Sequence, residues 1–260
     1  MVTLYVPDSR VPQVTVITAV FNAEAFVAQT VQSVLDQAFG DFEYLIVDDA
    51  STDSTPDIIQ GFAENDNRIH VFRNTRNLGV AASRNRALAQ AKGKYIAFLD
   101  GDDIWYPDFL REMLLFMEDG GFAFGCASHK RVDEKLIPLR KPFIVPEAIT
   151  RKELLRTCSV PLLTTMLRRD AFDEIRFPLL PVNNDYGLWL KLIRSCGTIY
   201  GNPKVLAVYR MRKGSVSSDK LRSMRYIWQL YRTQEKLGFL TACRLMFIYT
   251  LNGFRKYYGS

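Results

Sequence analysis

Three carboxylates cluster where an apolar segment of the chain ends. Asp100, Asp102 and Asp103 follow the run KYIAFL directly, within four residues. Like charges this close raise one another's pKa, so such a group favours a nearby cation. Carboxylate oxygens are hard ligands that suit Mg²⁺ or Mn²⁺, and such a metal is typically completed by phosphate oxygens of a substrate. The alternative is a solvated acidic turn in which Asp103 acts as a cap.

Two further acidic positions stand at the ends or starts of expected elements. Asp48 and Asp49 end the apolar segment EYLIVDD and begin the sequence DDASTD. A carboxylate here could accept hydrogen bonds from a base or a ribose, or form an Asx-turn leading into a helix capped by Thr55. Asp185 opens an amphipathic helix over 183–196. The helix dipole favours its ionised form, which suits either a simple helix-start residue or a general base.

The elements that must position these carboxylates alternate between strands and helices. Short β-branched runs predict strands over 14–20, 43–49, 69–72 and 94–100. Amphipathic spacing predicts helices over 24–37, from 55, over 80–91 and after 107. This order is typical of an α/β fold with a mostly parallel sheet and helices on both faces. Ligands in such sheets bind at the carboxyl ends of the strands, where the acidic residues cluster.

The second half of the chain is less regular. We expect a strand over 122–128, loop over 129–147, and a short helix opened by the capping box of Thr150 and Glu153. Residues 198–210 carry strand signals on both sides of a turn, and the chain from 217 onward is predicted to be helical.

Composition is that of a folded protein, and its charge is uneven. The 260 residues are 48% hydrophobic and carry a formal net charge of +6. Residues 210–260 hold 11 Lys and Arg against two acids, a net charge of +9, so the rest carries −3. Such a tail prefers anionic partners, but no nucleic-acid motif accompanies it, so we expect no nucleic acid partner. No signal sequence and no apolar run of about 18–20 residues is visible, which predicts a cytoplasmic protein.

Several common motifs are absent. The chain contains no G-x-G-x-x-G after the first strand, no P-loop, no H-E-x-x-H, no C-x-x-C and no G-x-S-x-G. Its four Cys are widely scattered in apolar surroundings, and we expect them to be buried free thiols. The expected sheet therefore binds its ligand through carboxylates rather than through a glycine cradle.

Four segments together resemble a known family. TAVFN, VDDASTD, LDGDD followed by Pro107, and NDYGLWLKL occur in that order over 14–196 and resemble the family 2 glycosyltransferases of the GT-A fold. The segment YRMRKGSVSS is similar to the bacterial branch that builds teichuronic acid, capsule and exopolysaccharide. The resemblance implies a GT-A (Rossmann-like) domain over 1–210, with a nucleotide-binding half (1–105) and an acceptor half (106–210). Residues 211–260 would form a basic, aromatic, helical extension.

The family implies inverting transfer of a sugar from a nucleotide-diphosphate donor, expected to be a UDP-sugar, to a hydroxyl of a glycan or lipid-linked acceptor. It also implies a divalent metal, Mn²⁺ or Mg²⁺. Positions matching its nucleotide-binding pattern are Thr18, Val20, Asn22, Asp49, Arg84 and Asp100.

Within that pattern, Thr18 and the backbone near Val20 would contact the base, and Asp49 would hydrogen-bond it. Val20 stands where the family often has Tyr, which leaves base stacking there unsupported. Arg84 would face the diphosphate.

The metal and the chemistry involve a second set of positions. Asp102 would ligate the metal, with Asp100 at the metal or the ribose. Asp185 would be the catalytic base, and Asn184 stands before it where the family usually has Glu. Arg210 is a further expected diphosphate contact.

Two rival functions and two uses of the tail stay open. A sugar nucleotidyltransferase has a related sheet but normally carries a Gly-rich phosphate loop, which this chain lacks. A non-catalytic nucleotide-sugar scaffold would not need Asp102 and Asp185. Residues 217–257 mix aromatic and basic side chains, which fits either an interfacial helix on the inner face of the membrane or packing on the body or on a second subunit as a homodimer.

Overall fold

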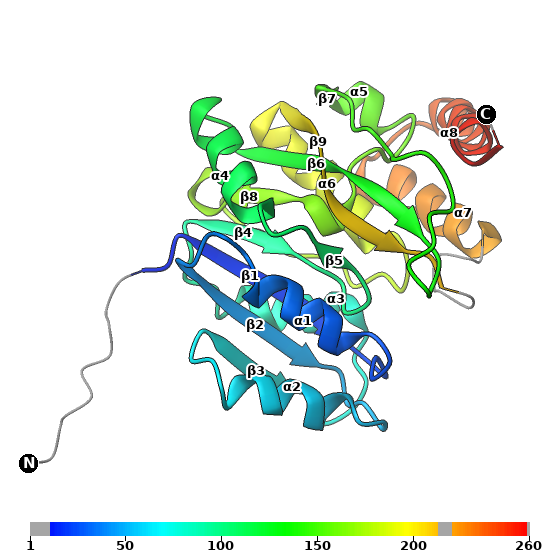
Figure 1. The fold of residues 1–260 in the computed structure, drawn as a ribbon. Helices are drawn as coiled ribbons and strands as arrows, with labels where there is room; N and C mark the ends of the chain where they lie inside the picture. Colours follow the sequence, from blue (N-terminus) through cyan, green and yellow to red (C-terminus); the bar gives the residue numbers. More distant parts are fainter. Residues whose placement is uncertain (1–10, 213–219, 259–260) are drawn as a thin grey trace, which may run out of the picture.

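A single nine-stranded sheet forms the centre of the computed structural model, which describes residues 11–212 and 220–258 (Figure 1). Its first four strands are parallel and run in the order β3-β2-β1-β4. Their bounds are Val14–Val20 (β1), Phe42–Asp48 (β2), Ile69–Arg73 (β3) and Tyr95–Phe98 (β4). The expected parallel arrangement is confirmed here, and the carboxyl ends of these strands meet at one edge.

The second half of the chain extends the sheet with antiparallel as well as parallel pairs. Beyond β4 the order is β8-β6-β9-β5, and β7 also pairs with β9. Only β6 and β9 are parallel in this part, so the whole sheet is mixed rather than mostly parallel. The bounds are Ile104–Trp105 (β5), Phe124–Val132 (β6), Ala148–Thr150 (β7), Met166–Arg168 (β8) and Thr198–Arg210 (β9).

Two sequence expectations in this half were wrong. β6 continues through His129–Val132, which we expected to be loop, because it pairs with β9 from Gly125 to Val132. β9 is one strand, not two strands around a turn. The register shifts opposite Ala127 and Ser128 show that the segment around Asn202 is accommodated as a bulge within the ladder.

Helices cover both faces of the sheet, as predicted. One face packs against α1, α2 and α4, and the other against α3, α6 and the tail. The bounds are Val27–Leu35 (α1), Thr55–Ala63 (α2), Val80–Leu88 (α3), Phe109–Asp119 (α4), Arg151–Leu154 (α5) and Asn184–Cys196 (α6). The capping box of Thr150 and Glu153 is present at α5. Thr55, expected as a cap, is instead the first helical residue of α2.

The tail packs on the body through one of its faces. It comprises α7 (Lys220–Gln229), a π-helical turn (Leu230–Gln234) and α8 (Phe239–Tyr258). Its buried apolar residues are Ile227, Leu230, Tyr231 and Ala242. Residues 213–219 and 259–260 of the predicted tail, and the side chain of Phe254, lie outside the described part. Among the helices that the structure describes, none has the length and apolar character needed to cross a bilayer.

An ion-pair cluster fastens the tail to the body. The Glu235 carboxylate is fully buried and pairs with Arg151 of α5 and Arg194 of α6. We expect Glu235→Gln to lower the free energy of unfolding by about 1–3 kcal/mol, because two charge-assisted hydrogen bonds are weakened while both Arg side chains can still reach water. Chemical denaturation measures this. The control is Glu64→Gln on the exposed C-terminal end of α2, and an equal effect in both variants would contradict the expectation.

Candidate functional site

The ends of β1 and β2 are tied together by polar contacts. The Asn22 side chain accepts a hydrogen bond from the Thr52 backbone N–H (2.9 Å), and the Asn22 N–H donates to Ser51 Oγ (2.9 Å). Asn22 has a φ of 47°, which its short polar side chain tolerates. Asn22 is exposed, so this predicted nucleotide-binding residue stands at the open edge of the sheet.

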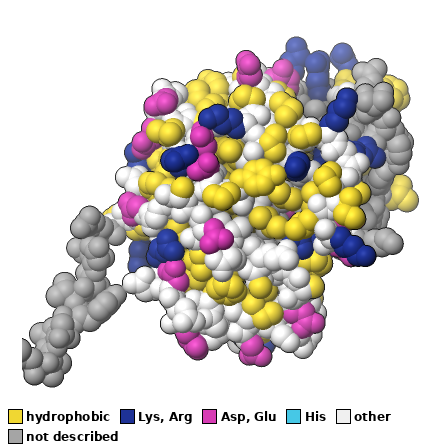
Figure 2. All heavy atoms as spheres, viewed as in Figure 1, with side chains coloured by type: hydrophobic (Ala, Val, Ile, Leu, Met, Phe, Trp, Pro, Cys, Tyr) yellow, Lys and Arg dark blue, Asp and Glu magenta, His cyan; other side chains and the backbone are white. Residues whose placement is uncertain are grey.

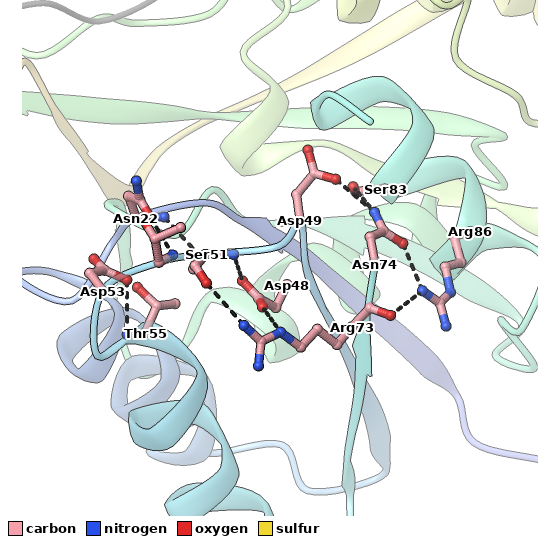
Figure 3. A network of polar contacts seen from close by, with 11 residues as sticks. Asn22, Asp48, Asp49, Ser51, Asp53, Thr55, Arg73, Asn74, Ser83 and Arg86 are labelled. Carbon is pink, nitrogen blue, oxygen red and sulfur yellow. Dashed lines mark hydrogen bonds and ion pairs between the residues drawn. The ribbon is translucent and has the colours of Figure 1, made fainter. Parts of the chain in front are cut away.

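The adjacent carboxylates of Asp48, the last residue of β2, and Asp49 point to opposite sides of the strand end (Figure 3). Asp48 is fully buried; it accepts from the Ser51 N–H (3.0 Å) and pairs with Arg73 (3.1 Å). This is the turn-forming role that we weighed as the alternative for the segment. Asp53 completes the turn by accepting from the Thr55 N–H (3.0 Å) at the start of α2.

Asp49 organises the loop between β3 and α3. Its Oδ1 accepts from Asn74 Nδ2 (2.7 Å) and from the Leu78 N–H (2.9 Å), and its Oδ2 accepts from the Gly79 N–H (2.8 Å). Gly79 has a φ of 87°, a conformation that L side chains rarely adopt. Three internal donors use three of the roughly four acceptor positions of this carboxylate. Hydrogen bonding of Asp49 to a base stays a prediction.

Thr18 and Val20 lie inside the sheet rather than on its open edge. Thr18 is fully buried, with its hydroxyl 3.0 Å from that of Tyr44. Val20 is also buried, and a Cβ at Gly101 would come within 2.6 Å of its Cγ1. The glycine of LDGDD therefore allows the acidic turn to pack closely on the end of β1. A base contact from this strand would come through backbone groups, and this too stays a prediction.

Arg84 joins three segments that are distant in sequence. From α3, its guanidinium pairs with Asp100 at the end of β4 and donates to Asn184 Oδ1 (2.9 Å) at the start of α6. Arg84 is buried and also lies over the ring of Phe177. The residue that departs from the family pattern, Asn184, is thus held as a neutral acceptor of this bridge. The bridge brings the first turn of α6, with Asp185, to the acidic turn.

The rest of the acidic turn faces two arginines at the end of β9. Asp102 pairs with Arg212 (Oδ2 to Nε, 2.5 Å) and is largely buried. Burial raises the pKa of Asp102, and the Asp100 carboxylate raises it further, while Arg212 opposes both. Asp103 is fully buried and accepts from the Arg210 backbone N–H (2.8 Å). Burial raises the pKa of Asp103 well above its ordinary value.

The Arg210 side chain turns toward α1. It donates to Gln29 (2.7 Å) and lies over the ring of Phe26, as does Arg212. Its predicted diphosphate contact is not tested by this arrangement. Sequence reasoning missed Arg212, although the alternation of Arg210 and Arg212 at the end of a strand puts both side chains on one face and could have indicated it.

Two carboxylates rather than a full cage are available to a metal. Within residues 11–212 and 220–258, no group of three or more His, Cys, Asp or Glu side chains is arranged to enclose a cation. Asp100 and Asp102 are hard ligands on one turn, and a cation there would be completed by phosphate oxygens. This donor set fits Mg²⁺ or Mn²⁺ bound together with a diphosphate. The cation would compete with Arg212 for Asp102.

Asp185 stands half-buried in the first turn of α6. Burial raises the pKa of Asp185 above its ordinary value of 3.8, against the hydrogen bond from the Tyr186 backbone and the charge of Arg84. A carboxylate with a raised pKa is a stronger base than an exposed one. The site thus combines an acidic turn, two arginine side chains that contact it from other elements, and a separate carboxylate, Asp185, whose pKa is raised.

This fold is that of a GT-A glycosyltransferase. The family model for glycosyl transferase family 2 matches residues 15–176, and the chain belongs to that family. Over 245 residues it is 38% identical to TuaG of Bacillus subtilis, assigned by name to teichuronic acid biosynthesis, covering 94% of this chain and 97% of that protein. It is 31% identical over 224 residues to the Escherichia coli protein WfgD, named as a UDP-Glc:α-D-GlcNAc-diphosphoundecaprenol β-1,3-glucosyltransferase, covering 84% of both chains.

Solved structures share the architecture. Residues 1–349 of TarS from S. aureus, in complex with UDP-GlcNAc, match with a TM-score of 0.71 at 23% identity, over 90% of this chain and 70% of that one. The mannosyltransferase PcManGT from Pyrobaculum calidifontis, in complex with GDP-Man and Mn²⁺, matches with a TM-score of 0.69 at 20% identity, over 88% and 66%. At these identities the likeness establishes the fold alone, and it confirms the expected fold class.

Proposed function

We propose that this protein is a metal-dependent, inverting glycosyltransferase that moves a sugar from a UDP-sugar to a hydroxyl of a glycan or lipid-linked acceptor in bacterial cell-surface polysaccharide synthesis. The names of TuaG and WfgD support the pathway class and the lipid-linked acceptor. The name of WfgD, which gives UDP-Glc as the donor, supports the donor class.

The observation that carries this proposal is the Arg84 bridge. It couples Asp100, beside the proposed metal ligand Asp102, to Asn184, beside the proposed base Asp185. A donor diphosphate and a catalytic carboxylate must lie on either side of one sugar, and a rigid link between their two segments meets that need.

At the donor end, Asp100 and Asp102 would hold the divalent cation. When bound, the cation supplies positive charge that stabilises the departing diphosphate. Arg84 and Arg212, which pair with carboxylates of the same turn, add two guanidinium groups. A guanidinium group can form bidentate hydrogen bonds with phosphate oxygens. Release of Arg212 from Asp102 would free its charge for the diphosphate.

At the acceptor end, Asp185 would take the proton from the attacking hydroxyl. The hydroxyl oxygen forms the new bond to the anomeric carbon, and the old bond to the diphosphate breaks with its electron pair leaving on the phosphate oxygen. Attack opposite to the leaving group inverts the anomeric configuration in one displacement. No covalent enzyme intermediate is formed.

Competition at Asp102 yields a test that is independent of turnover. We expect Arg212→Gln to bind Mn²⁺ alone about three- to tenfold more tightly, because loss of a partly buried ion pair frees the carboxylate. Electron paramagnetic resonance of free Mn²⁺ measures this affinity. The control is Arg111→Gln, which removes an exposed partner of Asp108 on α4. Unchanged Mn²⁺ affinity in Arg212→Gln would contradict the competition.

The proposed function is tested by thermal stabilisation with a panel of nucleoside diphosphates, with and without Mn²⁺. A ligand that binds only the folded state raises the melting temperature by mass action. We expect UDP to raise it in a Mn²⁺-dependent way. If no nucleoside diphosphate does so, the proposal fails.

A further inference from the structure

Helix α8 is apolar on two opposite sides. One side carries Ala242, Leu245 and Tyr249, which pack against the core of the body. The other side exposes large apolar residues with helical spacing, at positions 240, 247 and 251. Their exposed fractions are Leu240 82%, Phe247 66% and Leu251 45%, and Phe239 beside them is 62% exposed. Steps of seven and four residues return to the same helical face, so these side chains form one stripe about 17 Å long.

Along residues 221–252 of the tail, the exposed charge is of one sign. Within residues 221–252 the exposed basic side chains are Arg222, Arg225, Arg232, Lys236 and Arg244. Glu235 is the one acid in that segment, and it is buried between Arg151 and Arg194. Arg244 lies within the stripe itself, one turn after Leu240. Lys and Arg side chains also gather at the upper right of Figure 2, near the position of α5 in Figure 1, with Asp or Glu side chains beside them.

We propose that this stripe of α8, with Arg244 on it and further exposed basic residues elsewhere in the tail, docks the protein on an anionic lipid surface. Apolar side chains bordered by Lys and Arg are what an interfacial helix needs: the former enter the headgroup boundary and the latter contact lipid phosphates. No described segment of the chain covers the stripe. Residues 221–252 expose five basic side chains and no acid, and this excess of positive charge favours an anionic surface over a protein partner of mixed charge.

The docking helix is mechanically linked to the proposed base. The ring of Tyr249 lies 5.7 Å from that of Tyr186, the residue after Asp185. Asn183, which precedes α6, donates its Nδ2 to the Ser223 carbonyl of α7 (3.0 Å). The tail thus supports the first turn of α6 directly. The meaning of this link rests on the proposed function: a surface-docked α8 would hold Asp185 close to the headgroup layer, where the hydroxyl of a lipid-linked acceptor lies.

Vesicle flotation of the full chain tests the inference. The vesicles are pure phosphatidylcholine or a 3:1 mixture of phosphatidylcholine and phosphatidylglycerol, a ratio of about 25% anionic lipid. We expect binding to the anionic vesicles that weakens with salt, and little binding to the neutral ones. The variant Leu240→Ser with Phe247→Ser should bind at least about tenfold more weakly, because insertion depends on buried apolar area. Arg244→Gln should weaken binding and reduce its salt dependence.

The matched control is Val11→Ser with Leu115→Ser, which removes two side chains that are 66% and 53% exposed elsewhere. Wild-type-like flotation of the α8 double variant would overturn the inference. The inference would also be overturned if wild type were a dimer and the double variant a monomer that still binds vesicles, because the stripe would then be the contact with a second copy of this chain. Thermal stabilisation by UDP and Mn²⁺ is measured on the same samples. If the α8 double variant loses flotation but keeps this stabilisation, the inference is supported. If wild type shows no stabilisation, the proposed function is contradicted, whereas the inference about lipid docking is not.

Discussion

Asp185→Asn should lower turnover by about 10²- to 10⁴-fold while leaving donor binding intact. Asn cannot accept the hydroxyl proton, and loss of a general base typically has an effect of this size. Donor affinity should persist because the Arg84 bridge runs through Asn184 and Asp100, not through Asp185. Steady-state transfer kinetics measure the loss, and thermal stabilisation by UDP and Mn²⁺ measures the binding.

The pH dependence separates a base from a merely structural residue. Because burial raises the pKa of Asp185, activity should fall as the pH drops through a value above 3.8, and Asp185→Asn should lack that limb. The raised pKa also means that ionisation of Asp185 costs stability as the pH rises through the same window. The variant should therefore melt no lower than wild type at neutral pH. Asp170→Asn, on an exposed turn, is the control, and turnover of Asp185→Asn near that of this control would refute the assignment.

Asp102→Asn should weaken metal-dependent nucleotide binding by at least about 100-fold. Changing residues that merely orient metal ligands costs 10- to 100-fold in affinity, and loss of a ligand itself should cost no less. The variant also leaves Arg212 without its carboxylate partner. Calorimetric titration of UDP in the presence of Mn²⁺ measures the change.

The control for this variant lies six residues downstream. Asp108→Asn removes an exposed carboxylate that pairs with Arg111, so it changes the same charge close by. If Asp102→Asn and Asp108→Asn bound UDP and Mn²⁺ equally well, the acidic turn would not be the metal site.

Local signals in the sequence predicted the first half of the fold closely. The β-branched run over 14–20 became β1 with the same bounds, and its neighbours followed in a parallel order. These elements can be predicted locally because each buries an apolar face, and the spacing of apolar residues in the sequence reveals that face. The second half depends on long-range pairing. β9 was divided wrongly because Asn202 and Pro203 indicate a turn locally, whereas pairing with β6 over distance keeps the strand whole.

The candidate site likewise has a part that the sequence indicated and a part that it did not. The carboxylates Asp100 and Asp102 were visible because several acids after an apolar strand are unusual, and Asp185 was visible because it stands in the segment NDYGLWLKL that resembles the family. Their partners were not: Arg212 at Asp102 and Asn74 at Asp49 are ordinary residue types in unremarkable segments. Neighbouring strands bury the Thr18 side chain against Tyr44, which the motif did not indicate, and its contact with a base stays a prediction. Which side chains of a motif stay accessible is set by tertiary packing, which a motif does not encode.

The most direct test of the central claim is a transfer assay with the full chain, a panel of UDP-sugars and a diphosphate-linked lipid acceptor. The account predicts UDP release that requires both acceptor and divalent metal, with a product of inverted anomeric configuration by nuclear magnetic resonance. Retention of configuration, or release that is indifferent to Asp185→Asn, would contradict the single displacement with Asp185 as base.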